Sequence, residues 1–111
     1  MPKGVLIVPS GPSDPSREDE YNEWYDNTHI REVRDVPGVV STRRFTLSAV
    51  QRNALDESTP RYLAIYELDA DDLQSVADEI GKRLSSGVIH MTDAFHVDPR
   101  YPAMYFEQRD A

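Results

Sequence analysis

The chain has 111 residues, which fits one domain over residues 1–111, and its 20 acidic and 12 basic side chains give a net charge of −8. This negative field repels phosphate backbones and anionic lipids, so we expect neither nucleic acid nor a membrane as a partner. The absence of cysteine excludes disulfides, thiolate nucleophiles, zinc–thiolate sites and iron–sulfur clusters. The N-terminal apolar run is too short for a signal peptide or a membrane span, so we expect a cytoplasmic protein.

The first elements along the chain are a strand and a helix. Val5–Val8 is an apolar run between glycine and proline, which predicts a buried strand. The following helix has two alternative starts, one with Asp14 as cap and proline in the first turn, and one with Ser16 as cap. It extends to residue 30 or 33, and Pro37-Gly38 marks where it has stopped.

The rest of the chain predicts three more strands and one more helix. The strands are 39–50, 61–68 and 103–108, and the helix follows the acidic residues 69–72 and ends before Gly87. Residues 51–60 are polar and predict a loop, whereas residues 88–102 show no clear period.

This order of elements predicts an α+β fold, the ferredoxin-like βαββαβ arrangement. Its antiparallel four-stranded sheet would carry both helices on one face. In strand 61–68, Tyr62 and Tyr66 share one face, and Leu63 and Ile65 lie on the other. No element remains to cover that second apolar face, so we expect a homodimer packed through the sheet face.

A resemblance to a known family supports this fold. The stretch EYNEWYDNTHIREVRDVPGVVSTRRF (20–45), followed by RYLAIYEL (61–68), resembles the dimeric α+β barrel superfamily, in particular its EthD-like and muconolactone methylisomerase-like members. The shared pattern is an aromatic-rich first helix that ends in a histidine, then a Pro-Gly turn and a strand. The superfamily includes isomerases, polyketide cyclases, cofactor-free oxygenases and haem enzymes, so the resemblance implies a fold more firmly than a reaction.

The resemblance also implies a role for one residue. In the methylisomerase-like members the first-helix histidine points into a cleft between helices and sheet and shuttles protons on a bound lactone, and His29 occupies the matching position. Tyr62 and Tyr66 would line that cleft. The chain departs from these relatives in two ways. Asn22 stands where relatives often carry an aromatic residue, and Tyr21 lies one position earlier. The cysteine that the methylisomerase-like proteins use is missing, so their reaction is not expected here.

The chemistry of His29 and its neighbours leaves two interpretations open. Imidazole titrates near neutral pH and is the usual acid–base group, but a buried histidine can also be a core residue bonded to a main-chain carbonyl. Tyr21, Trp24 and Tyr25 could be core packing or the lining of a pocket for a flat ligand. The hydroxyls of Tyr62 and Tyr66 need partners if buried, which a ligand-filled cleft would supply.

Three further candidates lie in the irregular segment. His90, Asp93 and His96 carry side chains that suit Zn²⁺, Fe²⁺ or Mn²⁺, but their spacing brings three ligands together only in a special turn, so we expect no metal site. His96 could instead be a second pocket histidine or a surface residue. One of the consecutive arginines 43 and 44 would face the helices and the other the dimer side, and the sequence does not settle which.

These observations lead to a functional hypothesis with two alternatives. We expect a small cofactor-free enzyme of isomerase, cyclase or lyase type that uses His29 for proton transfer on a hydrophobic cyclic or aromatic molecule. Tyr21, Trp24, Tyr25 and other aromatic residues would shape its pocket. The alternatives are a non-catalytic binding or scaffolding dimer, and a haem- or metal-dependent oxygenase.

Overall fold

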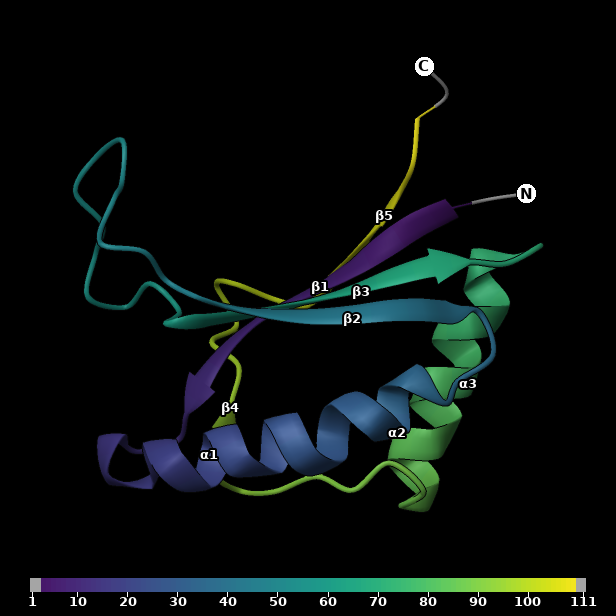
Figure 1. The fold of residues 1–111 in the computed structure, drawn as a ribbon, viewed down its shortest axis with the longest axis horizontal. Coiled ribbons are helices and arrows are strands. Elements are labelled where there is room, and N and C mark those ends of the chain that lie inside the picture. Colours follow the sequence, from purple (N-terminus) through teal and green to yellow (C-terminus); the bar gives the residue numbers. More distant parts are fainter. Residues whose placement is uncertain (1–2, 110–111) are drawn as a thin grey trace.

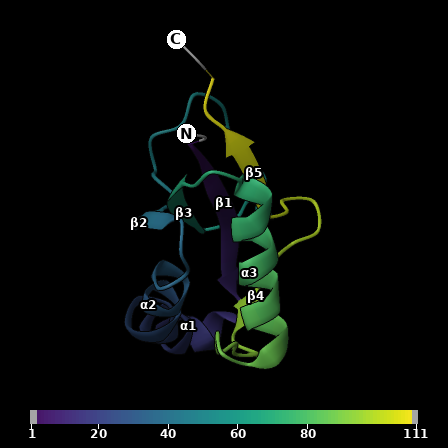
Figure 2. The same cartoon turned by 90° about the vertical axis from the view of Figure 1, so that its right-hand side faces the viewer.

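A computed structural model describes residues 3–109. Its antiparallel sheet has the order β2-β3-β1-β4, and β5 also pairs with β1. The strands are β1 (Lys3–Pro12), β2 (Val39–Thr46), β3 (Tyr62–Asp69), β4 (Phe95–His96) and β5 (Met104–Glu107). Both helical segments lie on the same side of this sheet (Figures 1 and 2). The predicted α+β arrangement is therefore confirmed.

The first helical segment consists of four consecutive elements. They are η1 (Pro15–Arg17), α1 (Glu18–Trp24), the π-helical turn η2 (Tyr25–His29) and α2 (Ile30–Arg34). Asp14 is the cap, because its side chain accepts a hydrogen bond from the Ser16 amide and proline follows it, so the first of the two predicted starts is correct.

The second helix is α3 (Leu73–Ser86), and a capping residue accounts for each of its ends. The Asp72 side chain accepts a hydrogen bond from the Gln74 amide at the start. Gly87, with a φ of +83°, provides the left-handed end. No helix within residues 3–109 is both long enough and apolar enough to cross a bilayer.

Two strand predictions differ from the structure. The strand predicted for 39–50 ends at Thr46. The Leu47 amide still bonds the Arg61 carbonyl, and the chain then leaves the sheet as a loop. The edge beside β1 is built from two short strands: β5 pairs with the first half of β1, and β4 pairs with Gly11 and Pro12. A two-residue strand such as β4 has no period that a sequence pattern could detect.

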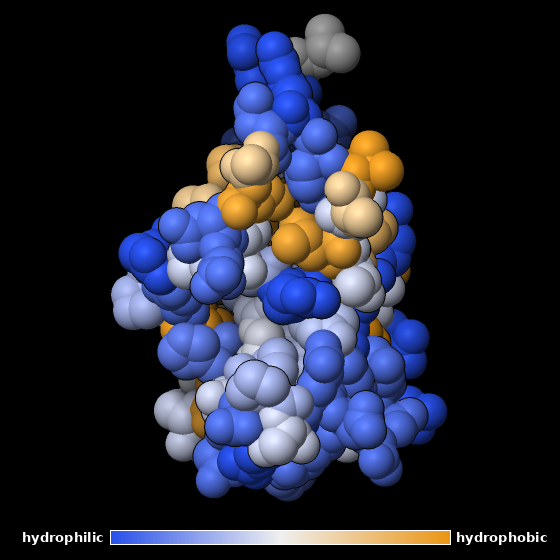
Figure 3. Space-filling model, turned by 90° about the vertical axis from the view of Figure 1, so that its left-hand side faces the viewer, coloured by the Kyte–Doolittle hydropathy of each residue, from blue (hydrophilic) through white to orange (hydrophobic). Residues whose placement is uncertain are grey.

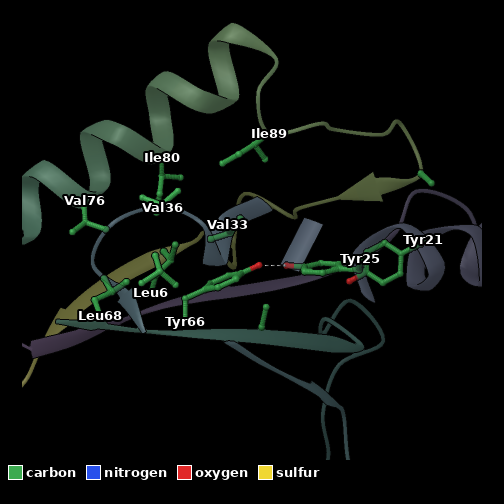
Figure 4. Packing of buried hydrophobic residues seen from close by; sticks show 13 residues of the cluster. Leu6, Tyr21, Tyr25, Val33, Val36, Tyr66, Leu68, Val76, Ile80 and Ile89 are labelled. Carbon is green, nitrogen blue, oxygen red and sulfur yellow. Dashed lines mark hydrogen bonds between the residues drawn. The ribbon is translucent and has the colours of Figure 1, made fainter. Parts of the chain in front are cut away.

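The core lies between the sheet and the helices (Figure 4). Tyr66 and Leu68 of β3 are buried there, as predicted for this face of the strand. The helical side adds Val33, Val76 and Ile80. Apolar burial of this kind contributes roughly 25 cal/mol per Å², and it fixes the first helical segment against the strands.

The opposite face of the sheet is apolar and uncovered by any element of the described chain. Strand register places Ile7 opposite Ile65 and Val5 opposite Phe106, and directly opposite residues share a face. Phe106 is 51% exposed and Phe45, on the same face, is 42% exposed. Figure 3 shows the end of the molecule that carries the β2–β3 loop, and apolar side chains gather in the upper half of this view. A groove of about 330 Å³ lies near that loop.

Candidate functional site

The candidate site begins with the π-helical turn η2. Its wider turn is closed by the Ile30 amide, which bonds the Tyr25 carbonyl five residues earlier. Single π-turns inside α-helices are frequent at functional sites. Here the turn keeps both Tyr25 and His29 buried against the sheet, and no feature of the sequence predicted it.

The side chain of His29 sits among aromatic rings. The indole of Trp24 stacks on the imidazole at a centroid distance of 4.6 Å, and Tyr25 meets it edge-on at 5.1 Å. The ring is 7% exposed, and its Nδ1 atom is fully buried without a partner. Burial lowers the pKa of His29 from 6.5 to about 4, so the ring is neutral near pH 7.

A cavity of about 250 Å³ borders His29. Its walls come from both sheet and helices, and also from the irregular segment and β5. Among the described lining residues, the polar side chains are His29, Tyr66 and Tyr105, and the remainder are apolar: Leu6, Val8, Val33, Ile80, Leu84, Met91, Phe95, Val97 and Ala103. An apolar hollow with a few polar groups is the usual form of a small-molecule site.

The sequence did not identify most of the cavity wall. Met91, Phe95 and Tyr105 come from the segment without a clear period and from the last strand, and only the tertiary structure brings them near His29. The aromatic composition of this part of the chain was the one available signal. It does not show which residues face inward.

Arg44 is the arginine that faces the helices. Its guanidinium carbon lies 4.1 Å from the ring centre of Tyr25 and 5.3 Å from that of Tyr21, and its Nη1 pairs with Asp26 at 2.9 Å. Arg43 lies on the open face, where it pairs with Glu67 at 2.7 Å. The structure thus settles the question that alternation alone left open, and it buries a cation directly behind the Tyr25 ring.

The predicted tyrosines separate into different surroundings. Tyr66 lines the cavity and its hydroxyl donates to that of Tyr25 at 3.5 Å. Tyr62 lies outside the cavity, where its hydroxyl bonds Glu18 and Asn22 at 2.5 and 3.1 Å. Tyr66 is four residues after Tyr62 and points to the same face of β3, but the two side chains lie more than one two-residue repeat apart along the strand. One tyrosine therefore reaches the cavity and the other does not.

Tyr21 also lies outside the cavity. It is fully buried, and its hydroxyl shares a hydrogen bond of 2.6 Å with Ser10. Protein groups therefore satisfy the tyrosine hydroxyls of this region, and the partners expected from a ligand are not needed to explain their burial.

The structure does not bring the three candidates of the irregular segment together. His90 pairs through Nδ1 with Glu32 at 2.7 Å, and Asp93 pairs with Arg17 at 2.7 Å. His96 lines a separate cavity of about 220 Å³ together with Ser10 and Asp98. Within residues 3–109, no three histidine or carboxylate side chains converge in a way that could hold a metal ion.

Comparison with known proteins gives matches among solved structures. An ethyl tert-butyl ether d (EthD) family protein from Bacillus halodurans C-125 superposes with a TM-score of 0.61 and 18% identity over 98% of this chain and 100% of that chain. HapK from Hahella chejuensis superposes with a TM-score of 0.62 and 13% identity over 97% and 94%. No family model matches the chain, and no curated protein matches it. The predicted resemblance to EthD-like proteins is confirmed at the level of the fold.

Proposed function

We propose that this chain is a small enzyme that moves a proton on a hydrophobic cyclic or aromatic molecule, with His29 as general acid and base and without a cofactor. One observation carries the proposal: a buried imidazole, whose Nδ1 atom has no hydrogen-bond partner among the described residues, borders an apolar cavity of about 250 Å³. The EthD-like fold is compatible with it, although a shared fold does not define a reaction.

The electrostatics of the cavity favour a particular kind of proton transfer. The neutral ring can accept a proton from a carbon next to a carbonyl, which leaves an imidazolium beside an enolate. Burial opposes the imidazolium alone, because it lowers the pKa of His29 to about 4. Negative charge developing on the substrate offsets that cost, since opposite charges attract strongly where water is excluded. General acid–base transfer of this kind contributes roughly 10²–10⁴ in rate.

The cavity also restricts the ligand. Its volume of about 250 Å³ is below the ~300–1,000 Å³ typical of drug-sized ligands, which favours a compact ring system. The hydroxyls of Tyr66 and Tyr105 are the groups that could orient oxygen substituents. Apolar side chains would contact the remaining surface of the ligand.

Deuterium exchange tests this proposal without knowledge of the natural substrate. A panel of cyclic ketones and lactones is incubated with the protein in D₂O, and deuterium at the carbon next to the carbonyl is measured by mass spectrometry. We expect exchange with the wild-type protein and a loss of at least 100-fold in His29→Asn. His90→Asn is the matched control, because that histidine is exposed and lies against Glu32. Equal exchange in both variants would remove His29 from the mechanism, and tight binding without exchange would indicate a binding protein.

We also propose that the protein forms a homodimer through the open face of the sheet. The face carries Ile7, Ile65, Phe45 and Phe106, and a hollow of about 460 Å³ lies at its edge. Exposed apolar surface of this kind is costly in a monomer. Sedimentation should give twice the chain mass, and Ile65→Arg should give a monomer. Val88→Arg serves as control, since Val88 is 58% exposed and lies outside the sheet. A wild-type monomer would contradict this proposal.

A further inference from the structure

Trp24 contacts His29 from outside the cavity. The indole stacks on the imidazole, with ring centres 4.6 Å apart and ring planes inclined by 24°. His29 is among the described residues that line the cavity of about 250 Å³, whereas Trp24 is not. Any effect of Trp24 on chemistry in this cavity must therefore act through His29.

The π-helical turn explains how Trp24 and His29 come to stack. Side chains five residues apart point about 140° away from each other around an ideal α-helix, so they do not normally meet. The turn η2 follows Trp24 and ends at His29, and its hydrogen bond closes over five residues. Such a turn is wider than an α-helical one and brings side chains five positions apart onto the same side of the helix.

Contacts with three other residues hold the indole in place. The Nε1 atom of Trp24 donates a hydrogen bond of 3.1 Å to the His90 carbonyl, and the His90 amide donates in turn to the Glu32 carboxylate at 2.7 Å. The rings of Tyr25 and Phe95 lie 5.2 and 5.5 Å from the indole and are inclined to it by 65° and 58°. Turning the indole away from the imidazole would break these contacts, so the stacked arrangement is preorganised.

The indole face attracts the protonated form of the imidazole. An aromatic face carries partial negative charge, and a cation within about 6 Å of the ring centre is attracted to it, most strongly in the case of tryptophan. The imidazolium of His29 would lie at 4.6 Å, and the residue is only 7% exposed, so little water screens the attraction. The neutral ring gains less from the same contact, because it carries no net charge. The geometry therefore favours protonation of His29.

Several other charged and titratable groups surround His29. Burial lowers the pKa of His29, the charge of Glu32 raises it, and the charge of Arg44 lowers it. The Glu32 carboxylate also bonds the ring of His90 at 2.7 Å. Burial raises the pKa values of the neighbouring tyrosines and keeps them neutral near pH 7; these are Tyr25, Tyr66 and Tyr105. The residues that α3 and the irregular segment add to the cavity wall are apolar. Of these groups, Glu32 alone favours the imidazolium.

We propose that Trp24 is a positioning residue for proton transfer by His29, because its indole face stabilises the imidazolium and its fixed plane orients the ring at the cavity wall. The inference rests on the proposed role of His29. As a C–H bond of the substrate breaks, its electron pair stays on the substrate as an enolate and its proton forms an N–H bond with the imidazole. The proton later returns to the substrate, so the imidazole ends unchanged. The indole exchanges neither atoms nor electrons.

Fluorinated tryptophan tests this role without a substrate. The chain has a single tryptophan, so a tryptophan-auxotrophic host supplied with monofluoro- or difluorotryptophan alters position 24 alone. Fluorine withdraws electron density from the indole face and weakens its attraction for a cation, while the ring keeps its shape. The pKa of His29 is measured by NMR on protein labelled with ¹⁵N-histidine. We expect this pKa to fall stepwise along the series, by at least about 0.2 in the difluoro protein.

The measurement has an internal control. The ring signals of His96 appear in the same spectra and should respond to pH alike in all three proteins, because His96 is exposed and lines the other cavity. The upper part of the titration, between about pH 4.5 and 6, is sufficient, since a group with a pKa of about 4 already begins to take up protons there. Acid unfolding at lower pH therefore does not prevent the measurement. A pKa of His29 that stays constant or rises with fluorination would overturn the role of Trp24.

A second pair of variants separates the aromatic face from the hydrogen bond. Trp24→Phe and Trp24→Leu both lose the bond to the His90 carbonyl, but only phenylalanine keeps an aromatic face. His29 should therefore have the higher pKa in Trp24→Phe, and this variant should exchange deuterium into the ketone and lactone panel at least about threefold faster than Trp24→Leu. Equal pKa values in the two variants would overturn the inference, and this comparison decides alone if the fluorinated proteins do not fold. A pKa that follows the aromatic face, without turnover of any panel compound, would count against catalysis by His29 and not against stabilisation of its imidazolium by Trp24.

Discussion

Acidification should destabilise this protein in a way that depends on one residue, His29. Its pKa is about 4 in the folded state, against an ordinary value of 6.5, because the ring is buried. Between these values the unfolded chain binds a proton at this position and the folded chain does not. The stabilising contribution is therefore fully present above about pH 6.5 and is lost as the pH falls toward 4.

The magnitude follows from the two pKa values. Each pH unit in this window costs about 1.4 kcal/mol of unfolding free energy. From pH 7 to pH 4 the loss due to His29 is roughly 3 kcal/mol, a large part of the ~5–15 kcal/mol that stabilises a typical domain. Carboxylates with lowered pKa values, such as Asp14 and Asp98, add their own acid sensitivity, so a variant is needed to isolate the histidine.

Urea unfolding at fixed protein concentration provides the measurement. The free energy of unfolding is determined at pH 7 and pH 4 for the wild type and for His29→Leu, which cannot take up the proton. We expect the wild type to lose roughly 3 kcal/mol more than the variant over this range. His96→Leu should behave like the wild type, because that side chain is exposed. Equal losses in wild type and His29→Leu would show that the ring is not held neutral by burial, and the proposed electrostatics of the cavity would fail.

Three more substitutions test other parts of the structure. Arg44→Met should lower the free energy of unfolding by about 2 kcal/mol, because it removes the contacts of a largely buried guanidinium with tyrosine rings and its ion pair with the exposed Asp26. Arg43→Met on the open face should cost less than about 1 kcal/mol in urea unfolding. Gly38→Ala should cost at least about 1 kcal/mol in thermal unfolding, since the residue has a φ of +98° and a Cβ would lie 2.6 Å from Val76; an unchanged melting temperature would contradict this. Glu32→Gln should speed amide hydrogen exchange in residues 88–94 by at least threefold without changing exchange in β3. The reason is that the Glu32 carboxylate bonds both the backbone amide and the ring of His90. Unchanged protection of residues 88–94 would show that this contact does not hold the segment.

The sequence by itself determined the features that depend on neighbours along the chain. Periodicity gave the order of the main strands and helices. Cap chemistry narrowed the first helix start to Asp14 or Ser16, of which the structure has Asp14, and it placed the end of α3 at Gly87. Alternation in β3 correctly assigned Tyr66 to the helical face and Ile65 to the other. These are local properties, since side-chain direction in a strand or helix follows directly from position in the chain.

Only the tertiary structure decided how distant residues meet. It placed Arg44 under the helices, separated Tyr62 from the cavity that Tyr66 lines, and brought Phe95 and Tyr105 to His29. It also revealed the π-helical turn and the buried hydroxyls. Each of these depends on contacts between elements far apart in sequence, and such contacts are selected by packing of the whole core and not by any local pattern.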